Sequence, residues 1–322
     1  MPQFTHNNHL KFGWGDGLYN FDDKNEKFWL EPGTVEYIPT SFKDECVRSA
    51  KLIGAAADKP ILLGFSGGVD SEIAARSFIE ADVPFEIVFK NVVYNGNIIN
   101  SHDTMYAKSF IKKYNIKSHT IDLDFKKLVD RFTRIRESNN TAEPYYKTNI
   151  SPLGVVTMFE SFCNDYVCVK GAGELFLSTY RRFNEPEPVQ YGIYATGNMA
   201  QEISSYEMSH RNSANIINFF CYTPETWLAW LLHPDVQHWI KYEKALMGPY
   251  TWMNNYSLKA FIVYKIWPDM EIRPKFNGFE YVPEYNELFN DTFYHDNTVL
   301  TKIPIEDLTN MLLRGSNRKR KL

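Results

Sequence analysis

The sequence predicts an α/β fold in which a parallel sheet carries helices on both faces, followed by a mainly helical C-terminal half. Short apolar runs alternate with amphipathic helical stretches between residues 41 and 180, as expected for a sheet wound by right-handed crossovers. A glycine-rich turn follows the first of these apolar runs and opens a helix. Beyond Tyr180 long helical stretches predominate, which predicts a second structural unit.

The first helix is expected from Ser41 to about Ala57, because Cys46, Ala50 and Ile53 fall on one helical face and Ser41 is a suitable N-cap. The elements that follow are strands at 61–65, 85–89, 118–123 and 166–169, and helices at 71–81, 103–114 and 152–164. Residues 166–176 contain a second glycine turn. Both glycine turns follow strands, so we expect them to face one cleft at the carboxyl edge of the sheet.

We expect the chain to divide into four segments. Residues 1–40 are expected to form a small β cap or arm, 41–180 the α/β domain, 181–313 the mainly helical region, and 314–322 a basic and disordered tail. In the third segment we expect helices at 198–217, 224–232, 236–246 and 258–266, and a connection or active-site flap at 186–196.

The stretch Ile61-Leu-Leu-Gly-Phe-Ser-Gly-Gly-Val-Asp-Ser71 carries the clearest chemical signal. It brings backbone N–H groups, two hydroxyls and one carboxylate to a helix N-terminus, which is an anion site suited to phosphate. No lysine follows the glycines, so the loop is not of the Walker type.

Ser-Gly-Gly-Val-Asp-Ser (66–71) resembles the PP-loop of the ATP pyrophosphatase superfamily, which has a HUP-like fold. With Ile150-Ser-Pro-Leu, Val169-Lys-Gly-Ala-Gly-Glu-Leu-Phe176, Ser257-Leu-Lys-Ala-Phe-Ile262 and Ile272-Arg-Pro-Lys-Phe-Asn-Gly-Phe279, the order of motifs resembles the synthetase domain of asparagine synthetases and β-lactam synthetases. The likeness runs from about Ser41 to Phe279. Only the PP-loop is a highly specific motif.

The resemblance implies an AMP-forming ligase that cleaves ATP to AMP and pyrophosphate, adenylates a carboxylate or amide, and forms an amide or C–N bond. It implies ATP and Mg²⁺ as cofactors, with Asp70 and Glu174 as metal ligands. Lys275 matches the family's essential lysine, the alternative being a surface lysine. The implied catalytic residues are thus Lys275, Glu174 and Asp70, and the nucleotide-binding residues are Ser66, Gly67, Gly68, Asp70, Ser71, Gly171 and Arg181. Arg181 either meets phosphate or a substrate carboxylate, or is solvated.

Two positions depart from the family's second loop. Lys170 and Gly173 stand where the family has a glutamate and an aspartate, and Glu174 is retained. A lysine at that position suits an acidic substrate or a phosphate, which makes literal asparagine synthesis doubtful. The family's glutaminase domain has no counterpart before Ser41, so we expect free ammonia, a substrate amine, an internal nucleophile or a partner to supply the nitrogen.

Two other functions stay open. One is a PP-loop enzyme that modifies a nucleobase or tRNA, for which Cys163 and Cys168 are a poor version of the expected cysteines. The other is a catalytically decayed nucleotide-binding sensor. The net charge of −4 gives no global basic field, so nucleic acid is an unlikely partner and a small-molecule acceptor is favoured.

The composition indicates a protein with a packed core. The chain has 322 residues, of which 44% are hydrophobic and 16% aromatic, enough for a sizeable core. No apolar run approaches the ~20 residues that cross a bilayer. The four cysteines show neither zinc spacing nor C-x-x-C pairing, so we expect reduced thiols in a cytoplasmic protein without a membrane partner.

Overall fold

The computed structural model describes residues 11–14, 28–137, 150–181, 191–197, 216–246, 255–270, 282 and 303–314. Five strands of its central sheet run parallel to one another. They are β3 (Ile61–Gly64), β4 (Glu86–Tyr94), β6 (Ser118–Asp124), β7 (Val167–Lys170) and β10 (Ile216–Asn218). A short sixth strand, β5 (Asn97–Ile98), pairs antiparallel with the end of β4.

The first strand of the central sheet along the chain, β3, lies in the middle of the sheet. Across the sheet the strands follow the order β6-β4-β3-β7-β10, so the chain starts at the centre, winds to one edge and returns to build the other half. The direction of winding reverses between β3 and β7. In open α/β sheets a reversal of this kind opens a crevice at the carboxyl ends of the two strands, and ligands bind there.

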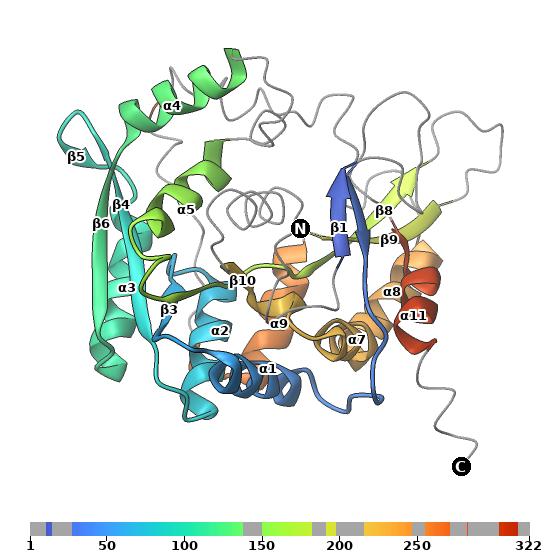
Figure 1. Ribbon diagram of the computed structural model, residues 1–322. Coiled ribbons are helices and arrows are strands. Elements are labelled where there is room, and N and C mark those ends of the chain that lie inside the picture. Colours follow the sequence, from blue (N-terminus) through green and yellow to red (C-terminus); the bar gives the residue numbers. More distant parts are fainter. Residues whose placement is uncertain are drawn as a thin grey trace.

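Helices cover both faces of this sheet (Figure 1). One face packs against α1 (Phe42–Ala56), α2 (Val69–Glu80) and α3 (Ser101–Tyr114), and the other against α4 (Phe125–Glu137) and α5 (Ile150–Glu160). Alternate residues of each strand enter the two apolar clusters; in β3, Leu63 faces the first set of helices and Leu62 the second. The parallel sheet with helices on both faces, expected from the sequence, is confirmed.

Local sequence explains where the helices begin and end. Ser41 caps α1, as predicted, by accepting a hydrogen bond from the Asp44 backbone N–H at 3.2 Å. Asn115 ends α3 in the left-handed conformation with φ 50°, a C-terminal position that asparagine tolerates. The sequence analysis did not predict α4, although its apolar residues recur at helical spacing.

Two segments differ from expectation. Residues 216–217 were expected to end a helix, but Ile216–Asn218 form β10, the fifth parallel strand, because these residues are buried between the two helical layers. Residues 191–196 were expected in a connection, but Tyr191–Gly197 form β9. The rest of the expected helix, 198–215, and of the expected connection, 186–190, lie outside the described residues.

Two smaller sheets flank the central one. The strands β1 (Lys11–Trp14) and β2 (Phe28–Glu31) pair antiparallel, and β9 pairs antiparallel with both β8 (Leu175–Arg181) and β11 (Ile303–Pro304). The helices of this half are α7 (Pro224–Leu232), α8 (Pro234–Leu246), α9 (Asn255–Ile266) and α11 (Ile305–Leu313). A 3₁₀ turn, η2 (Phe219–Cys221), joins β10 to α7.

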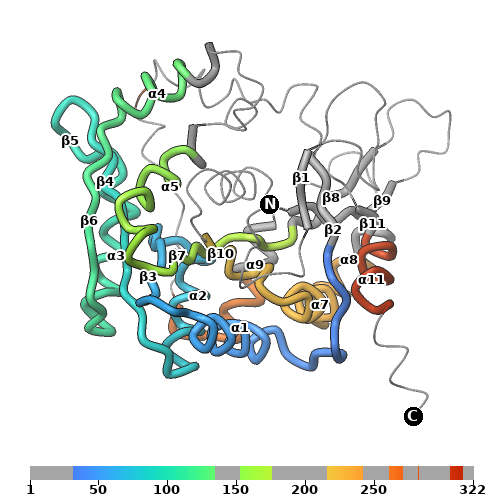
Figure 2. Tube along the Cα trace, in the orientation of Figure 1, coloured from blue at the N-terminus to red at the C-terminus, as the bar shows by residue number. Residues whose placement is uncertain are grey.

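The helical half packs directly on the α/β domain. Helix α7 contacts both α1 and α11 and lies between them in Figure 2, although the three helices are far apart in the sequence. Its buried side chains, among them Trp227, Leu228 and Leu231, join the same apolar cluster as α1 and α2. The two halves therefore share one core, and residues from α7 can reach the edge of the sheet.

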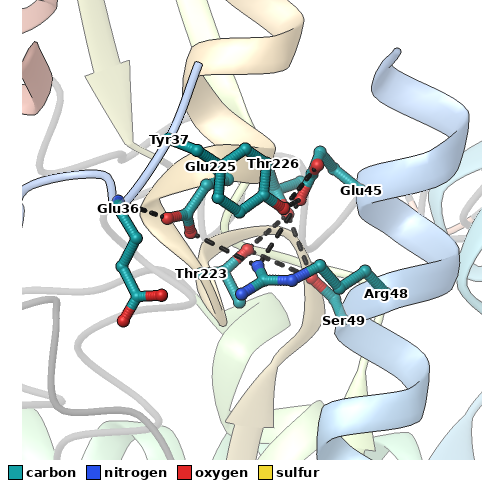
Figure 3. Close-up of polar contacts among 8 residues, drawn as sticks. All are labelled: Glu36, Tyr37, Glu45, Arg48, Ser49, Thr223, Glu225 and Thr226. Atoms are coloured by element: carbon teal, nitrogen blue, oxygen red, sulfur yellow. Dashed lines mark hydrogen bonds and ion pairs between the residues drawn. The ribbon is translucent and has the colours of Figure 1, made fainter. Parts of the chain in front are cut away.

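Buried polar contacts fix α7 against α1 (Figure 3). The Glu225 carboxylate, 3% exposed, accepts a hydrogen bond from the Glu36 backbone N–H at 2.7 Å and lies 3.5 Å from Arg48. The hydroxyls of Ser49, Thr223 and Thr226 form a triangle with separations of 2.9 to 3.3 Å. Because buried polar groups are costly unless paired, these contacts specify one packing of the two helices.

A three-residue ion cluster joins the end of α9 to the sheet helices. Asp269 accepts hydrogen bonds from Arg76 in α2 at 2.7 Å and from Lys113 in α3 at 2.9 Å. These two cations lower the pKa of the Asp269 carboxyl well below its usual value.

In the described part of the chain, no helix is long and apolar enough to span a bilayer.

Candidate functional site

The serine–glycine loop, Ser66–Ser71, joins the central strand β3 to α2. The Phe65 N–H still bonds the Val88 carbonyl at 2.8 Å, so the strand holds the chain up to the loop. The loop then closes on itself: Ser71 Oγ donates to the Gly68 carbonyl at 2.9 Å and lies 3.3 Å from Ser66 Oγ. Gly68 is the N-cap of α2, and the first turn receives no hydrogen bond from a capping side chain.

Two glycines bring backbone segments into close contact around this loop. Gly67 has φ +78°, and a Cβ built on it would lie 2.5 Å from the Asp103 carbonyl oxygen at the start of α3. A Cβ built on Gly171 would lie 2.7 Å from Ser71 Cα and 2.8 Å from the Asp70 carbonyl oxygen. Any larger residue would push the second glycine turn off the first turn of α2.

The second glycine turn is held from the helical half. The Phe220 N–H donates to the Ala172 carbonyl at 3.0 Å, and Trp227 Nε1 donates to the Gly173 carbonyl at 2.7 Å in a buried hydrogen bond. Gly173 has φ +87°, which favours glycine there. The turn thus presses on α2 from one side and is fixed by η2 and α7 from the other.

A cavity opens at the carboxyl ends of β3, β4 and β7, at the reversal point of the sheet. Its polar lining combines hydroxyl, amide, ammonium and carboxylate groups from both halves of the sheet. Its apolar lining comes from β3, β4, α3 and α5. The lining residues are Gly64, Phe65, Ser66, Ser71, Phe89, Lys90, Val92, Asn100, Asp103, Thr104, Ala107, Val155, Met158, Phe159, Lys170 and Gly171.

Adjacent residues of α2 face different hollows. Ser71 lines the cavity at the reversal point, whereas Asp70 lines a smaller and mainly aromatic hollow together with Glu174. Trp227, Trp230 and Phe220 form much of its wall. The first turn of α2 therefore separates a polar cavity from a hollow that holds two carboxylates.

The two carboxylates are the candidate ligands for a magnesium ion, although the exposed surface of their hollow is almost wholly apolar. Mg²⁺ is commonly held by one or two carboxylates together with water and phosphate oxygens. Asp70 and Glu174 share one hollow, and Asp70 directly precedes Ser71, which lines the neighbouring cavity. Over the described ranges no group of three or more His, Cys, Asp or Glu comes together, so a metal here would need oxygen ligands from a bound phosphate.

The structure brings together most of the residues singled out from the sequence. Ser66, Ser71 and Gly171 line the polar cavity, Gly67 and Gly68 shape its loop, and the two carboxylates face the adjacent hollow. Both glycine turns thus face one cleft, as expected.

The remaining candidate positions are Lys275 and Arg181. Lys275 lies outside the described residues, as do residues 315–322 of the basic tail. Arg181 ends β8. In α9, Lys265 forms an ion pair with Asp235 at 2.8 Å that joins this helix to α8.

The β4 side of the cavity was not predicted from the sequence. Lys90 follows the buried apolar run Ile87-Val-Phe89 within β4, and this charged residue was a signal present in the sequence. Asn100 is buried, and its side chain pairs with backbone groups of β4 as a neighbouring strand would. Its Oδ1 accepts a hydrogen bond from the Val92 N–H at 2.7 Å, and its Nδ2 donates one to the Lys90 carbonyl at 2.9 Å. Only the fold shows that the start of α3, with Asp103 and Thr104, meets the loop.

Cys163 and Cys168 do not line the cavity. Their sulfur atoms lie 3.9 Å apart, and Cys163 Sγ also donates to the Phe159 carbonyl at 3.2 Å. The contact with Cys168 lowers the pKa of Cys163, whereas the same contact and burial raise the pKa of Cys168. The pair is therefore a feature of the packing between α5 and β7.

Comparison with known proteins gives distant structural likenesses only. No protein-family model matches the sequence, and no curated protein matches it. Among solved structures, an NMN synthetase from Francisella tularensis is similar over 40% of this chain and 52% of its own length, with 17% identity and a TM-score of 0.29. The chain thus spans about half of that protein.

An NH3-dependent NAD synthetase from Campylobacter jejuni subsp. jejuni, solved with a nitrate ion, is similar over 73% of this chain and 97% of its own length. The identity is 10% and the TM-score 0.32. At these values the likenesses do not bear on the activity of this chain, which we infer below from the loop and the cavity.

Proposed function

We propose that this protein binds ATP at the polar cavity with Mg²⁺ beside it at Asp70 and Glu174, cleaves ATP between the α- and β-phosphates, and transfers the adenylyl group to a small acceptor. The observation that carries this proposal is the position of the serine–glycine loop. It lies at the reversal point of a doubly wound sheet, with both of its serines lining the cavity and the first turn of α2 behind them. Its sequence, Ser-Gly-Gly-Val-Asp-Ser, resembles a PP-loop.

The residues of the loop suit a departing pyrophosphate. Negative charge accumulates on the leaving group as the bond between the α-phosphorus and the bridging oxygen breaks. Backbone N–H groups of the first turn of α2 are donors for that charge, and the hydroxyls of Ser66 and Ser71 would join them by turning from their hydrogen bonds within the loop. The close contacts at Gly67 and Gly171 hold these donors in place before the nucleotide arrives.

The proposed transfer to the acceptor takes place in two steps. A carboxylate or amide oxygen attacks the α-phosphorus, pyrophosphate leaves, and an adenylated acceptor forms. An amine then attacks the activated carbon, AMP leaves, and the amine proton passes to a base. The product is an amide or another C–N bond, and the nitrogen comes from ammonia or an amine.

Asp70 and Glu174 would hold the magnesium ion, which offsets the charge of the phosphate oxygens during transfer. Both carboxylates face one hollow directly beside the loop. Lys275, which matches the family's essential lysine, is proposed to reach the leaving pyrophosphate. Arg181 is proposed to bind phosphate or a substrate carboxylate from the end of β8.

The nucleobase-modifying alternative would favour cysteines near the cleft, and Cys163 and Cys168 do not line the cavity. It shares the release of AMP and pyrophosphate with the proposed ligase, so the acceptor that supports this release separates the two. The sensor alternative predicts ATP binding without turnover, so measuring products separates it from the ligase.

The direct test is incubation with ATP, Mg²⁺ and pools of small carboxylates, amides and amines, followed by quantification of AMP, pyrophosphate and ADP. Acceptor-dependent release of AMP and pyrophosphate in equal amounts is expected. Formation of ADP would contradict cleavage between the α- and β-phosphates. Tight ATP binding with neither product across broad pools would favour the sensor.

A further inference from the structure

Two lysines line the cavity from opposite sides of the central strand. Lys90 comes from β4 and Lys170 from the end of β7, and β3 with its serine–glycine loop lies between these strands. Lys170 is only 5% exposed. Lysine is rarely buried to this extent, so its ammonium group gives the cavity lining a positive charge at some cost in stability.

Strand alternation places both lysines on the same face of the sheet. Val88 and Val92 flank Lys90 at alternate positions, and Cys168 stands two residues before Lys170; these three residues pack in the apolar cluster beneath α4 and α5. The lysines therefore project toward α5, on the side opposite α2.

A glycine leaves room for Lys90, and aromatic and apolar side chains separate the two lysines. On α5, a Cβ built on Gly154 would lie 3.0 Å from Lys90 Nζ. Gly64 is the residue in β3 that pairs in register with Lys170. The space above it is filled from α5, because a Cβ built on Gly64 would lie 2.7 Å from Phe159 Cζ and 3.1 Å from Met158 Cε. Side chains of α5 therefore line the cavity between the two lysines.

The position of Lys170 relates it to the loop. It directly precedes Gly171, whose backbone lies against Asp70 and Ser71 in the first turn of α2. If the loop holds the terminal diphosphate, as the proposed function states, the next phosphate along the nucleotide lies toward the floor of the cavity. Asp103 is the carboxylate of the same lining, at the wall formed by α3.

We infer that Lys90 and Lys170 form a second oxyanion subsite, distinct from the loop, that binds the α-phosphoryl group of the nucleotide. This inference rests on the proposed function and divides the triphosphate between two sets of residues. The loop binds the pyrophosphate that leaves, and the lysines bind the phosphoryl group that is transferred. Ammonium groups at that position oppose the charge on the α-phosphate oxygens as an acceptor attacks.

Binding measurements with three probes separate the two sets. AMP carries the α-phosphate alone, adenosine carries none, and inorganic pyrophosphate represents the leaving group. Titration calorimetry on the wild type should show AMP binding more tightly than adenosine. K170M should weaken AMP about ten- to hundredfold with adenosine affinity unchanged and pyrophosphate within about threefold.

Matched variants complete the experiment. S66A should weaken pyrophosphate and spare AMP, K90M should weaken AMP less than K170M, and K170R should retain part of the AMP affinity. K117M is the control, because Lys117 is an exposed lysine paired with Glu86 at 2.7 Å, and it should bind all three probes as the wild type does. Thermal melting of each variant checks that it is folded.

The results that overturn the subsite differ from those that overturn the proposed function. Equal affinity of the wild type for AMP and adenosine, or unchanged AMP affinity in both K170M and K90M, refutes the subsite. Loss of AMP affinity in K170M together with ADP as the ATP product keeps the subsite and refutes the adenylyl transfer. A wild type that binds none of these probes and no ATP refutes both.

Discussion

Gly67 lies directly against the Asp103 carbonyl, so the serine–glycine loop and the start of α3 are in backbone contact across the cavity wall. A Cβ built on Gly67 would lie 2.5 Å from that oxygen, and the residue has φ +78°. The loop conformation therefore depends on a neighbouring helix as well as on its own sequence. This relationship can be tested with a control of the same backbone conformation.

Gly67→Ala is expected to destabilise the protein and to reduce ATP affinity at least about tenfold, because it adds a collision to an unfavourable φ. Gly96 is the matched control: it has φ +80°, and a Cβ built there meets nothing within 4 Å. Gly96→Ala should cost only the conformational strain, about 1–2 kcal/mol, and leave ATP affinity unchanged. Urea unfolding and ATP titration measure both effects. Equal behaviour of the two variants would show that the contact with Asp103 is unimportant.

Asp70→Asn is expected to lower acceptor-dependent AMP release about 10²-fold or more, because the amide removes a negative charge from the proposed magnesium site. Stability should change by no more than about 0.5 kcal/mol, since Asp70 is only partly buried. Asp44→Asn is the control, as Asp44 is an exposed acid in the first turn of α1. Undiminished AMP release in Asp70→Asn would exclude the assigned role.

Trp227→Phe is expected to destabilise the protein by about 1–3 kcal/mol, because the buried Gly173 carbonyl loses its donor at 2.7 Å. ATP affinity should fall as well, since that hydrogen bond holds the second glycine turn against α2. Trp267→Phe is the matched comparison: its Nε1 donates to Glu80, a carboxylate that is 34% exposed and stays hydrated. Denaturant midpoints of the two variants give the difference, and an equal loss would contradict the special role of the Gly173 contact.

The serine–glycine loop could be predicted from the sequence, whereas most other residues that line the cavity could not. An apolar run that breaks into glycines and serines before a helix has few physical solutions, so the strand, the loop and the helix were predicted together. The three-residue strand β10 was not, because a short apolar run fits a buried strand and a buried helix equally well until its neighbours are known. Helix α4 was missed although Phe125, Leu128, Val129 and Phe132 recur at helical spacing.

The cavity lining depends on contacts between segments far apart in the chain. Lys90, Lys170 and Asn100 line one cavity because β4 and β7 flank β3, and strand order is not a local property of the sequence. The charged residue within the apolar strand β4 was nonetheless a readable signal, because such a position is unfavourable without a compensating role. Ser71 lines the polar cavity and Asp70 lines the aromatic hollow, whose wall includes side chains of α7. This arrangement could be seen only in the fold.

His233 predicts a dependence of stability on pH. It precedes α8 and accepts a hydrogen bond from the Asp235 N–H through Nδ1 at 3.3 Å, as an N-cap does. Burial lowers its pKa below the usual 6.5, Asp235 opposes that shift, and Lys265 adds to it. The unfolded chain therefore binds a proton near pH 6.5 that the folded chain does not, so this contribution to stability is complete above pH 6.5 and is lost as the pH falls toward the lowered pKa.

His233→Asn should remove this dependence while keeping an N-cap acceptor, since asparagine is among the preferred N-cap residues. At pH 8 the variant is expected within about 0.5 kcal/mol of the wild type, because both then carry a neutral cap. Between pH 7 and pH 5 the free energy of unfolding should fall less steeply in the variant than in the wild type. Urea unfolding at several pH values measures the two slopes. Parallel slopes would mean that His233 takes up its proton equally well in the folded and the unfolded chain, contrary to the burial that the structure gives it.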